Sequence, residues 1–411
     1  MFCKTTRAIY TTTDPSPKFA AQISTLPQGE GESVFSMTDI LAAARVIVIK
    51  VGSSLLVESE TGTMRREWLK SLAADIAALK RDGKQVVLVS SGAIALGRRA
   101  LKLKPGPLRL EESQAAAAAG QVRLAGAWAE CLKAEGITAA QVLLILDDTE
   151  NRRRYLNARA TLKTLLELSA VPVINENDTV ATSEIQFGDN DQLAARVASM
   201  MEADCLILLS DVDGLYTANP FLDPLAQHVA EVPAITPEVE AMAGGSVSGV
   251  GRGGMISKII AAKIAVSAGS DVVIAKGKTP NPIAAIRGRT ARATRFAASD
   301  TPAAARKRWI GGVLHPQGAL IIDDGAVRAL QKGSSLLPIG IRQIDGRFER
   351  GDPVIVRDSQ GHEIARGLVA YNASDAELIA GKRSLEIEAI LGYRGRDEMI
   401  HRDDLTLTVE A

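Results

Sequence analysis

The stretch RVIVIKVGSS, residues 45–54, decides the fold, because a short apolar run ends there in a turn of small polar residues. A helical pattern follows at residues 67–83, and the alternation then repeats. The later apolar runs are QVVLVS at 85–90, QVLLIL at 141–146, VPVIN at 171–175, DCLILLS at 204–210 and DVVIAK at 271–276. Strand-length apolar runs that alternate with helical stretches predict βαβ units. Because these strands are continuously apolar, we predict an α/β fold with a mostly parallel sheet covered by helices on both faces.

The two ends of the chain do not share this alternation. Residues 1–43 are rich in Thr, Ser, Pro and Gly and lack periodicity, which predicts a disordered N-terminal extension. Its basic start leaves two explanations, a transit peptide or an upstream extension with the true start nearer Met37. After a domain at 44–297 we expect a linker at 298–310. Short β-like runs punctuated by Gly and Asp then predict a compact, β-rich, barrel-like domain at 311–411.

The bulk composition argues against several classes of function. The 411 residues carry 48 basic and 48 acidic side chains, so no net charge attracts nucleic acid or an anionic membrane. No apolar run approaches the ~20 residues that a membrane helix needs. The three cysteines lie far apart without a CxxC pair, which indicates a reducing, cytoplasmic compartment. The four histidines are scattered, so any metal is expected to be a hard ion held by oxygens, such as Mg²⁺.

Four motifs of small and charged residues follow predicted strands or open predicted helices. They are IKVGSS at 49–54, SSGAIALG at 90–97, SDVDGLYTANP at 210–220 and SGVGRGGMISK at 248–258. Backbone N–H groups in such turns and helix starts can approach phosphate oxygens, and Lys50 and Lys258 add point charges. Each motif also has a plain structural explanation as an ordinary turn, strand end or surface linker. Together they fall where ligands bind in open α/β sheets, which favours a nucleotide phosphotransferase without a P-loop.

The stretch INENDTVATSEIQFGDND, residues 174–191, follows a predicted buried strand and concentrates acids and amides. It contains five carboxylates and three asparagines. A solvated loop would have this composition, and so would a site for an ammonium group, a metal ion or a catalytic lysine.

The order of these motifs resembles the amino-acid kinase family. The resemblance rests on IKVGSS, SSGA, VPVINENDTVAT, FGDND, LLSDVDGLYTANP and SVSGVGRGGMISK. It implies that family's three-layer sandwich, and NENDTVAT with GDND is typical of members that phosphorylate L-glutamate. The region after residue 311, with GSSLLPIGI and HRDDLTL, resembles a PUA domain. The resemblance covers the chain from about Arg45 to its end.

The resemblance implies transfer of the γ-phosphate of ATP, with Mg²⁺, to the side-chain carboxylate of L-glutamate, the first step of proline biosynthesis. The catalytic roles fall to Lys50, Asp191 and Lys258. The glutamate-binding roles fall to Ser91, Asn175, Asp178 and Asn190. The ATP-binding roles fall to Lys50, Gly52, Ser210, Asp211, Arg252, Gly253, Gly254, Met255, Ile256, Ser257 and Lys258. No residue is assigned as a metal ligand, and Glu176 and Glu184 are expected to be solvated.

The family also implies a homo-oligomer, commonly a tetramer, feedback inhibition by proline and a transient partnership with glutamyl-phosphate reductase. The alternatives on the same fold are N-acetylglutamate, aspartate and UMP kinases. An acetylated amine would not need Asp178, and UMP would need a more basic acceptor site. An RNA-binding protein that acts through the PUA domain is the alternative from another class. Residues 311–411 carry 12 basic and 16 acidic side chains, a net charge of −4 that opposes RNA binding.

Overall fold

The structure is a computed structural model that describes residues 37–58, 61–180, 190–243, 254–312 and 316–408. Its larger sheet has eight strands in the order β3-β4-β2-β1-β5-β9-β10-β8. The strands are β1 (Val46–Val51), β2 (Gln85–Ser90), β3 (Ala139–Leu144), β4 (Val171–Glu176), β5 (Cys205–Ser210), β8 (Glu231–Val232), β9 (Asp271–Lys276) and β10 (Ala293–Phe296). Only β10 against β9 is antiparallel among the pairings within this sheet. The mostly parallel sheet predicted from the apolar runs is therefore confirmed.

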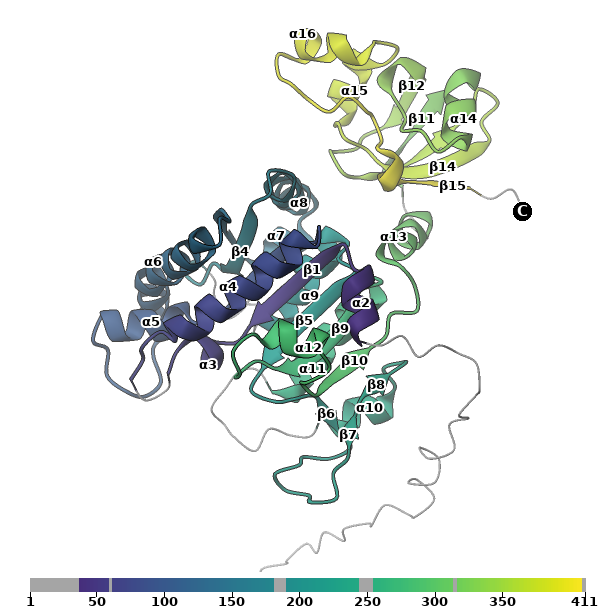
Figure 1. The fold of residues 1–411 in the computed structure, drawn as a ribbon. Coiled ribbons are helices and arrows are strands. Elements are labelled where there is room, and N and C mark those ends of the chain that lie inside the picture. Colours follow the sequence, from purple (N-terminus) through teal and green to yellow (C-terminus); the bar gives the residue numbers. More distant parts are fainter. Residues whose placement is uncertain (1–36, 59–60, 181–189, 244–253, 313–315, 409–411) are drawn as a thin grey trace, which may run out of the picture. The chain divides into compact units, whose positions relative to one another are not determined.

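Helices cover both faces of this sheet, which makes the domain a three-layer sandwich (Figure 1). One core contains side chains of α2 (Met37–Ala43), α4 (Arg66–Arg81), α5 (Ala93–Ala100), α6 (Leu110–Ala134) and α12 (Pro282–Arg287). The other contains side chains of α8 (Arg152–Glu167), α9 (Asn190–Met201) and α11 (Met255–Ser267). On β1, Ile47 and Ile49 belong to the first core and Val46 and Val48 to the second. A strand buried on both faces needs apolar side chains at successive positions, which explains the continuous run.

Shorter elements complete this part of the chain. They are α3 (Ser53–Leu56), α7 (Leu146–Glu150), β6 (Leu215–Tyr216), β7 (His228–Val229), α10 (Pro237–Met242) and α13 (Pro302–Gly311). Among the described residues, no helix is both long and apolar enough to cross a bilayer.

The C-terminal part is the expected β-rich domain, with a core of its own. Its sheet has the order β12-β11-β13-β14-β15. The strands are β11 (Gly318–Ile322), β12 (Ile341–Gly346), β13 (Pro353–Arg357), β14 (Glu363–Leu368) and β15 (Leu405–Leu407). The helices are α14 (Asp324–Gln331), α15 (Ala373–Ile379) and α16 (Ile387–Leu391). Leu320, Val354 and Ile400 are among the fully buried residues of this core.

Two segments differ from the expectation. Residues 37–43, which composition placed in the disordered extension, form α2, because Ile40 and Leu41 bury their side chains in the first core. The remainder of that extension, residues 1–36, lies outside the described residues. Residues 298–310, expected as a linker, are mostly helix α13, which starts at Pro302 behind the N-cap Thr301.

Candidate active site

Two lysines meet one buried carboxylate at the carboxyl end of β1. Lys50 Nζ lies 2.6 Å from Asp191 Oδ1, and Lys258 Nζ lies 2.9 Å from Asp191 Oδ2. The side chains of Lys50, Lys258 and Asp191 are 10%, 7% and 1% exposed. The three predicted catalytic residues are therefore in direct contact, although they are far apart in sequence. The cluster carries a net charge of +1 in a site that is nearly closed to water.

The environment of Asp191 sets its ionisation. Burial disfavours the charged carboxylate, but the ammonium groups of Lys50 and Lys258 outweigh that penalty and lower the pKa of Asp191. Asp191 is therefore ionised at neutral pH and holds both ammonium groups in place.

The ends of three elements bring these groups together. Lys50 lies in β1, one residue before its end, while Asp191 and Lys258 lie in the first turns of α9 and α11. The helices α9 and α11 pack against each other in the same layer. Helix N-termini carry unpaired backbone N–H groups and partial positive charge. The lysine cluster thus sits beside two helix starts that favour an anion.

Next to the lysines lies a group of hydrogen-bonded side chains that we call the amide wall. Its members are Ser91, Gln121, Asn175 and Asn190. Asn190 Nδ2 donates hydrogen bonds to Ser91 Oγ and Asn175 Oδ1, both at 2.8 Å. Asn175 Nδ2 in turn donates to Gln121 Oε1 at 2.8 Å. The Oδ1 atom of Asn190 is buried with no hydrogen-bond partner among the described residues. Such an acceptor matches a ligand that brings a donor, for example an ammonium group.

Sequence reasoning missed Gln121 and Trp128, which both lie on α6. Gln121 is a buried amide within the Ala-rich stretch AAAAAGQVRL, and that contrast was the only signal in the sequence. Trp128 Nε1 donates a hydrogen bond to Ser90 Oγ at 2.9 Å, next to Ser91. Gln121 thus extends the chain of hydrogen-bonded amides, and Trp128 contacts the residue before Ser91.

The acid-rich stretch after β4 is only partly described. Asp178 is half-buried just beyond the strand. Glu176, expected to be solvated, is instead 8% exposed, because it is the last residue of β4 and pairs with Leu144 of β3. Glu184 lies outside the described residues.

The predicted ATP-binding residues of β1 and β5 lie side by side. Ser210 ends β5 and is buried, and its hydroxyl donates to Asp211 Oδ1 at 3.0 Å. Asp211 is exposed. Because β1 pairs with β5, Gly52 lies beside Leu209, where a Cβ on Gly52 would be 3.7 Å from the Leu209 carbonyl oxygen and 3.9 Å from Lys50 Nζ.

The glycine loop enters the described residues only at its end. Gly254 is the N-cap of α11, and Met255, Ile256, Ser257 and Lys258 form its first turn. Ser257 is buried, whereas Ile256 is 49% exposed. Arg252 and Gly253 lie outside the described residues.

The exposed carboxylate of Asp211 fits a magnesium ion that arrives with a nucleotide. In the described part of the chain, no group of three or more His, Cys, Asp or Glu side chains could hold a metal ion. Mg²⁺ commonly needs only one or two carboxylates, since phosphates and waters supply its other ligands. Asp211, exposed at the sheet edge, is such a carboxylate.

Sequence comparisons identify the relatives of this chain. The amino acid kinase family model matches residues 45–276, and the PUA domain model matches residues 318–391. A glutamate 5-kinase of Paramagnetospirillum magneticum is 59% identical over 367 residues, which cover 89% of this chain and 99% of the relative. A glutamate 5-kinase of Rhodopseudomonas palustris is 60% identical over 363 residues, which cover 88% and 96%. Carbamate kinase from Giardia lamblia, at 18% identity and a TM-score of 0.45 with coverage of 63% and 100%, is too distant to bear on function.

The fold and the paired lysines define a kinase that lacks a P-loop. The chain belongs to the amino acid kinase family and, within it, to the glutamate 5-kinases.

Proposed function

We propose that this protein transfers the γ-phosphoryl group of ATP to the side-chain carboxylate of L-glutamate, forming L-glutamyl 5-phosphate, the first step of proline biosynthesis. The observation that carries the proposal is the contact of Lys50 and Lys258 with the single buried carboxylate of Asp191. Relatives named glutamate 5-kinase, matched over almost their whole length, support the choice of glutamate over N-acetylglutamate, aspartate, UMP or RNA.

The chemistry explains why the site needs no general base. The nucleophile is a carboxylate with an ordinary pKa of about 4.3, so it is already ionised at neutral pH. One carboxylate oxygen forms a bond to the γ-phosphorus as the bond from that phosphorus to the β,γ-bridging oxygen breaks, and ADP leaves. The difficulty is repulsion between two anions. The net positive charge of Lys50, Asp191 and Lys258 offsets that repulsion. The residues that bind glutamate and ATP align the two reactants.

We assign the amide wall to glutamate. Ser91, Asn175 and Asn190 hydrogen-bond the substrate without adding repulsion, and the unpartnered Oδ1 of Asn190 accepts from its ammonium group. Asp178, half-buried beyond β4, supplies a carboxylate for that ammonium group. A free amine therefore has partners here that an acetylated amine would not use.

We assign the opposite side to ATP. Gly52 gives the phosphates close access to Lys50, and Ser210 and Asp211 end the neighbouring strand. The run from Arg252 to Lys258 is proposed to cover the phosphates. Asp211 is the residue that would hold Mg²⁺, which neutralises phosphate oxygens when it is bound.

Several wider expectations remain proposals. We infer cytoplasmic localisation, because Cys131 and Cys205 are both free, buried thiols. By family we propose a homo-oligomer, commonly a tetramer, competition of proline at the amide wall, and a transient partnership with glutamyl-phosphate reductase. Residues 44–297 are proposed as the catalytic domain and 311–411 as a structural or regulatory domain.

The test is turnover with ATP and Mg²⁺ in the presence of hydroxylamine, which converts acyl phosphates to hydroxamates. We expect hydroxamate from L-glutamate, and none from L-aspartate or N-acetyl-L-glutamate. UMP is tested by ADP release, because it would give no acyl phosphate. The Lys258→Ala variant should lose at least about 100-fold in kcat, as expected when a transition-state charge partner is removed.

A matched control keeps this test specific. Lys263→Ala changes an exposed lysine of the same helix that pairs with Glu240. It should retain activity. Turnover of another acceptor in preference to glutamate would refute the substrate assignment, and an active Lys258→Ala variant would refute the assigned role of that lysine.

A further inference from the structure

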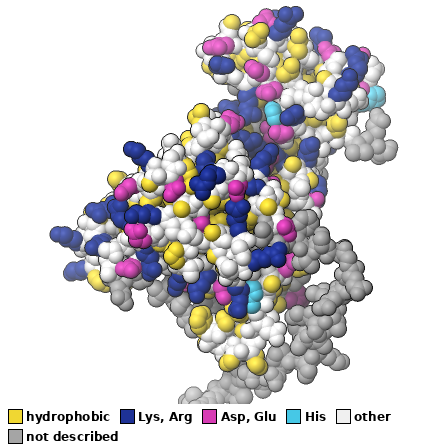
Figure 2. Space-filling view, viewed as in Figure 1, with side chains coloured by type: hydrophobic (Ala, Val, Ile, Leu, Met, Phe, Trp, Pro, Cys, Tyr) yellow, Lys and Arg dark blue, Asp and Glu magenta, His cyan; other side chains and the backbone are white. Residues whose placement is uncertain are grey.

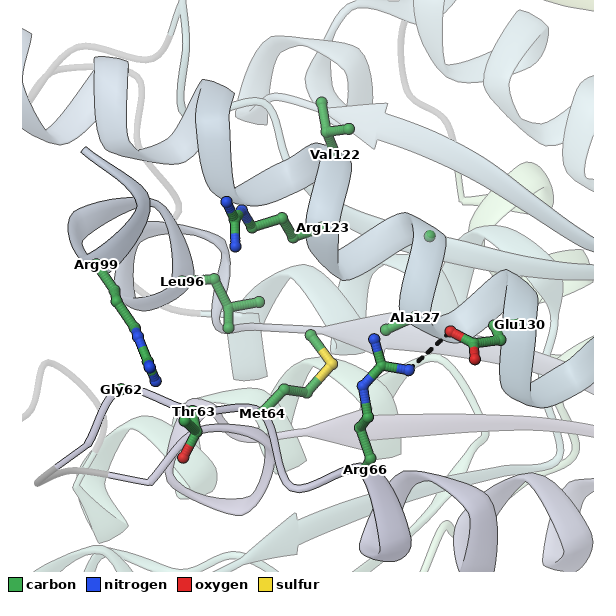
Figure 3. A pocket seen from close by; sticks show the side chains of 11 residues that line it. Gly62, Thr63, Met64, Arg66, Leu96, Arg99, Val122, Arg123, Ala127 and Glu130 are labelled. Carbon is green, nitrogen blue, oxygen red and sulfur yellow. Dashed lines mark hydrogen bonds and ion pairs between the residues drawn. The ribbon is translucent and has the colours of Figure 1, made fainter. Parts of the chain in front are cut away.

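A cavity of about 520 Å³ lies between α5, α6 and the turn that precedes α4, and it shares no residue with the lysine site (Figure 3). Its lining brings one arginine from each of three elements. Arg66 opens α4, Arg99 lies near the end of α5, and Arg123 lies in the middle of α6. A cavity of this size matches small-molecule sites in other proteins.

The positive charge of the cavity is only partly compensated. Arg66 Nη1 lies 2.8 Å from Glu130 Oε2, which is the one carboxylate of the lining. Arg99 Nη1 donates to the Thr61 carbonyl oxygen at 2.8 Å, a neutral acceptor that leaves its charge unbalanced. Arg123 has no hydrogen bond or ion pair with any described residue. Two guanidinium charges thus face the cavity without a carboxylate.

The surroundings reinforce this charge. Residues 98–123 contain six basic and two acidic side chains, a net charge of +4. Figure 2 shows Lys and Arg side chains gathered at the end of the domain that α5 and α6 form in Figure 1. The nearby Glu58 accepts hydrogen bonds from the hydroxyls of Thr61 and Thr63 rather than from an arginine of the cavity. A concave site with one sign of charge concentrates ligands of the opposite charge.

The centre of the cavity is apolar. Leu96 is 6% exposed and Ala127 is 5% exposed, and Met64 packs partly buried against the same core. In Figure 3, Met64 and Leu96 lie between the three labelled arginines. A ligand that fits would therefore combine an apolar body with charged groups at its edge. Guanidinium groups bind phosphate and carboxylate through paired N–H donors.

We propose that this cavity binds a small organic anion with at least two negative charges, carried by phosphate or carboxylate groups on an apolar body. The anionic groups bind Arg99 and Arg123, and the apolar body packs on Met64 and Leu96. The site is separate from the proposed catalytic site. The same helices connect the cavity with the proposed catalytic site, because α5 begins two residues after Ser91 and packs closely on α6.

The test is isothermal titration of the full-length protein with two probes, phenyl phosphate and phthalate. Both combine a ring with two negative charges, so their comparison distinguishes a phosphate from a dicarboxylate ligand. We expect at least one probe to bind the wild-type protein with a dissociation constant below about 1 mM. Arg123→Ala and Arg99→Ala should each weaken that binding by at least about tenfold. Arg123→Lys, which keeps the charge but loses the paired donors, should lie in between.

Arg81→Ala is the matched control. Arg81 is an exposed arginine in the last turn of α4, outside the cavity, so the variant removes the same charge without touching the site. It should bind the probes like the wild type, and far-ultraviolet circular dichroism should show all variants folded. Equal affinity in wild type and Arg123→Ala would overturn the proposal, because the probe would then be bound elsewhere. Failure of both probes to bind the wild-type protein would also overturn it. A changed oligomeric state of Arg123→Ala in sedimentation would do the same, because the cavity would then be a contact between subunits.

Discussion

Asp191 holds one negative charge between two ammonium groups, in a place where water cannot replace a lost partner. A buried ion pair adds little net stability, because desolvation offsets its attraction. Removing one member is costly, because the remaining charges stay buried without compensation. The main role of Asp191 is therefore to hold Lys50 and Lys258 at the proposed binding site of the phosphate oxygens.

The first prediction concerns Asp191→Asn, which keeps the shape of the side chain and removes its charge. Lys50 and Lys258 then repel each other, so we expect the free energy of unfolding to fall by about 3 kcal/mol. We expect kcat to fall at least about 100-fold. Urea unfolding and the hydroxamate assay measure the two effects. Asp211→Asn, at an exposed carboxylate, should leave stability within about 0.5 kcal/mol of wild type.

The lowered pKa of Asp191 predicts how its contribution to stability depends on pH. The folded-state pKa lies below the unfolded value of about 3.9, so ionised Asp191 contributes its stability fully above that value. The contribution is lost as pH falls through the folded-state pKa. The stability difference between wild type and Asp191→Asn should therefore be constant from about pH 7 to pH 5 and shrink below about pH 4. A difference that grows towards low pH would contradict the lowered pKa.

Motifs located the charged residues of the site because lysine and aspartate at strand ends and helix starts stand out in a sequence. Lys50 and Lys258 stood out in this way, Asp191 was assigned through the family resemblance, and the structure brings the three into contact. Gln121 was not assigned to the site from the sequence. A single amide in an Ala-rich helix becomes recognisable as a site residue only when the fold places it against Asn175. Burial is equally a tertiary property, which is why Glu176 was taken to be solvated.

At the scale of elements, α5 and α6 make a very close crossing. A Cβ atom on Gly97 would lie 1.6 Å from the Ala116 carbonyl oxygen, and one on Gly120 would lie 1.7 Å from that of Ala93. These two glycines let the backbones touch, so the helices behave as one unit. Ser91, just before α5, and Gln121, on α6, belong to the amide wall. Both helices also line the cavity that contains Arg99 and Arg123.

Gly97→Ala should therefore force the two helices apart, because the Ala116 carbonyl cannot move without moving α6. We expect the free energy of unfolding to fall by about 3 kcal/mol, at the upper end for overpacked cores. Gly126→Ala is the matched control, because it lies on α6 with nothing within 4 Å of its ideal Cβ position. It should stabilise the protein by about 0.5 to 1 kcal/mol through helix propensity. Equal effects of the two substitutions in urea unfolding would contradict the tight crossing.

Alternation of apolar runs and helical stretches predicted the parallel sheet because both periodicities are local. It could not predict α2, whose seven residues are too few for a periodic pattern. That helix exists through its buried contacts: Ile40 is 7% exposed and Leu41 is 1% exposed. Composition alone assigned it to the flanking polar segment.

At the scale of the whole molecule, the described cores and the site begin only at α2. Every described core residue belongs to residues 37–411, the second of the two units into which the chain divides. A chain that starts at Met37 should therefore keep the melting temperature and the kcat of the full chain. A chain that starts at Arg45 exposes the core surface that Ile40 and Leu41 cover, and it should lose about 3 kcal/mol of unfolding free energy. Differential scanning calorimetry of the three chains measures the comparison. If the chain from Met37 were as destabilised as the chain from Arg45, the first 36 residues would have to contribute to the fold of the second unit.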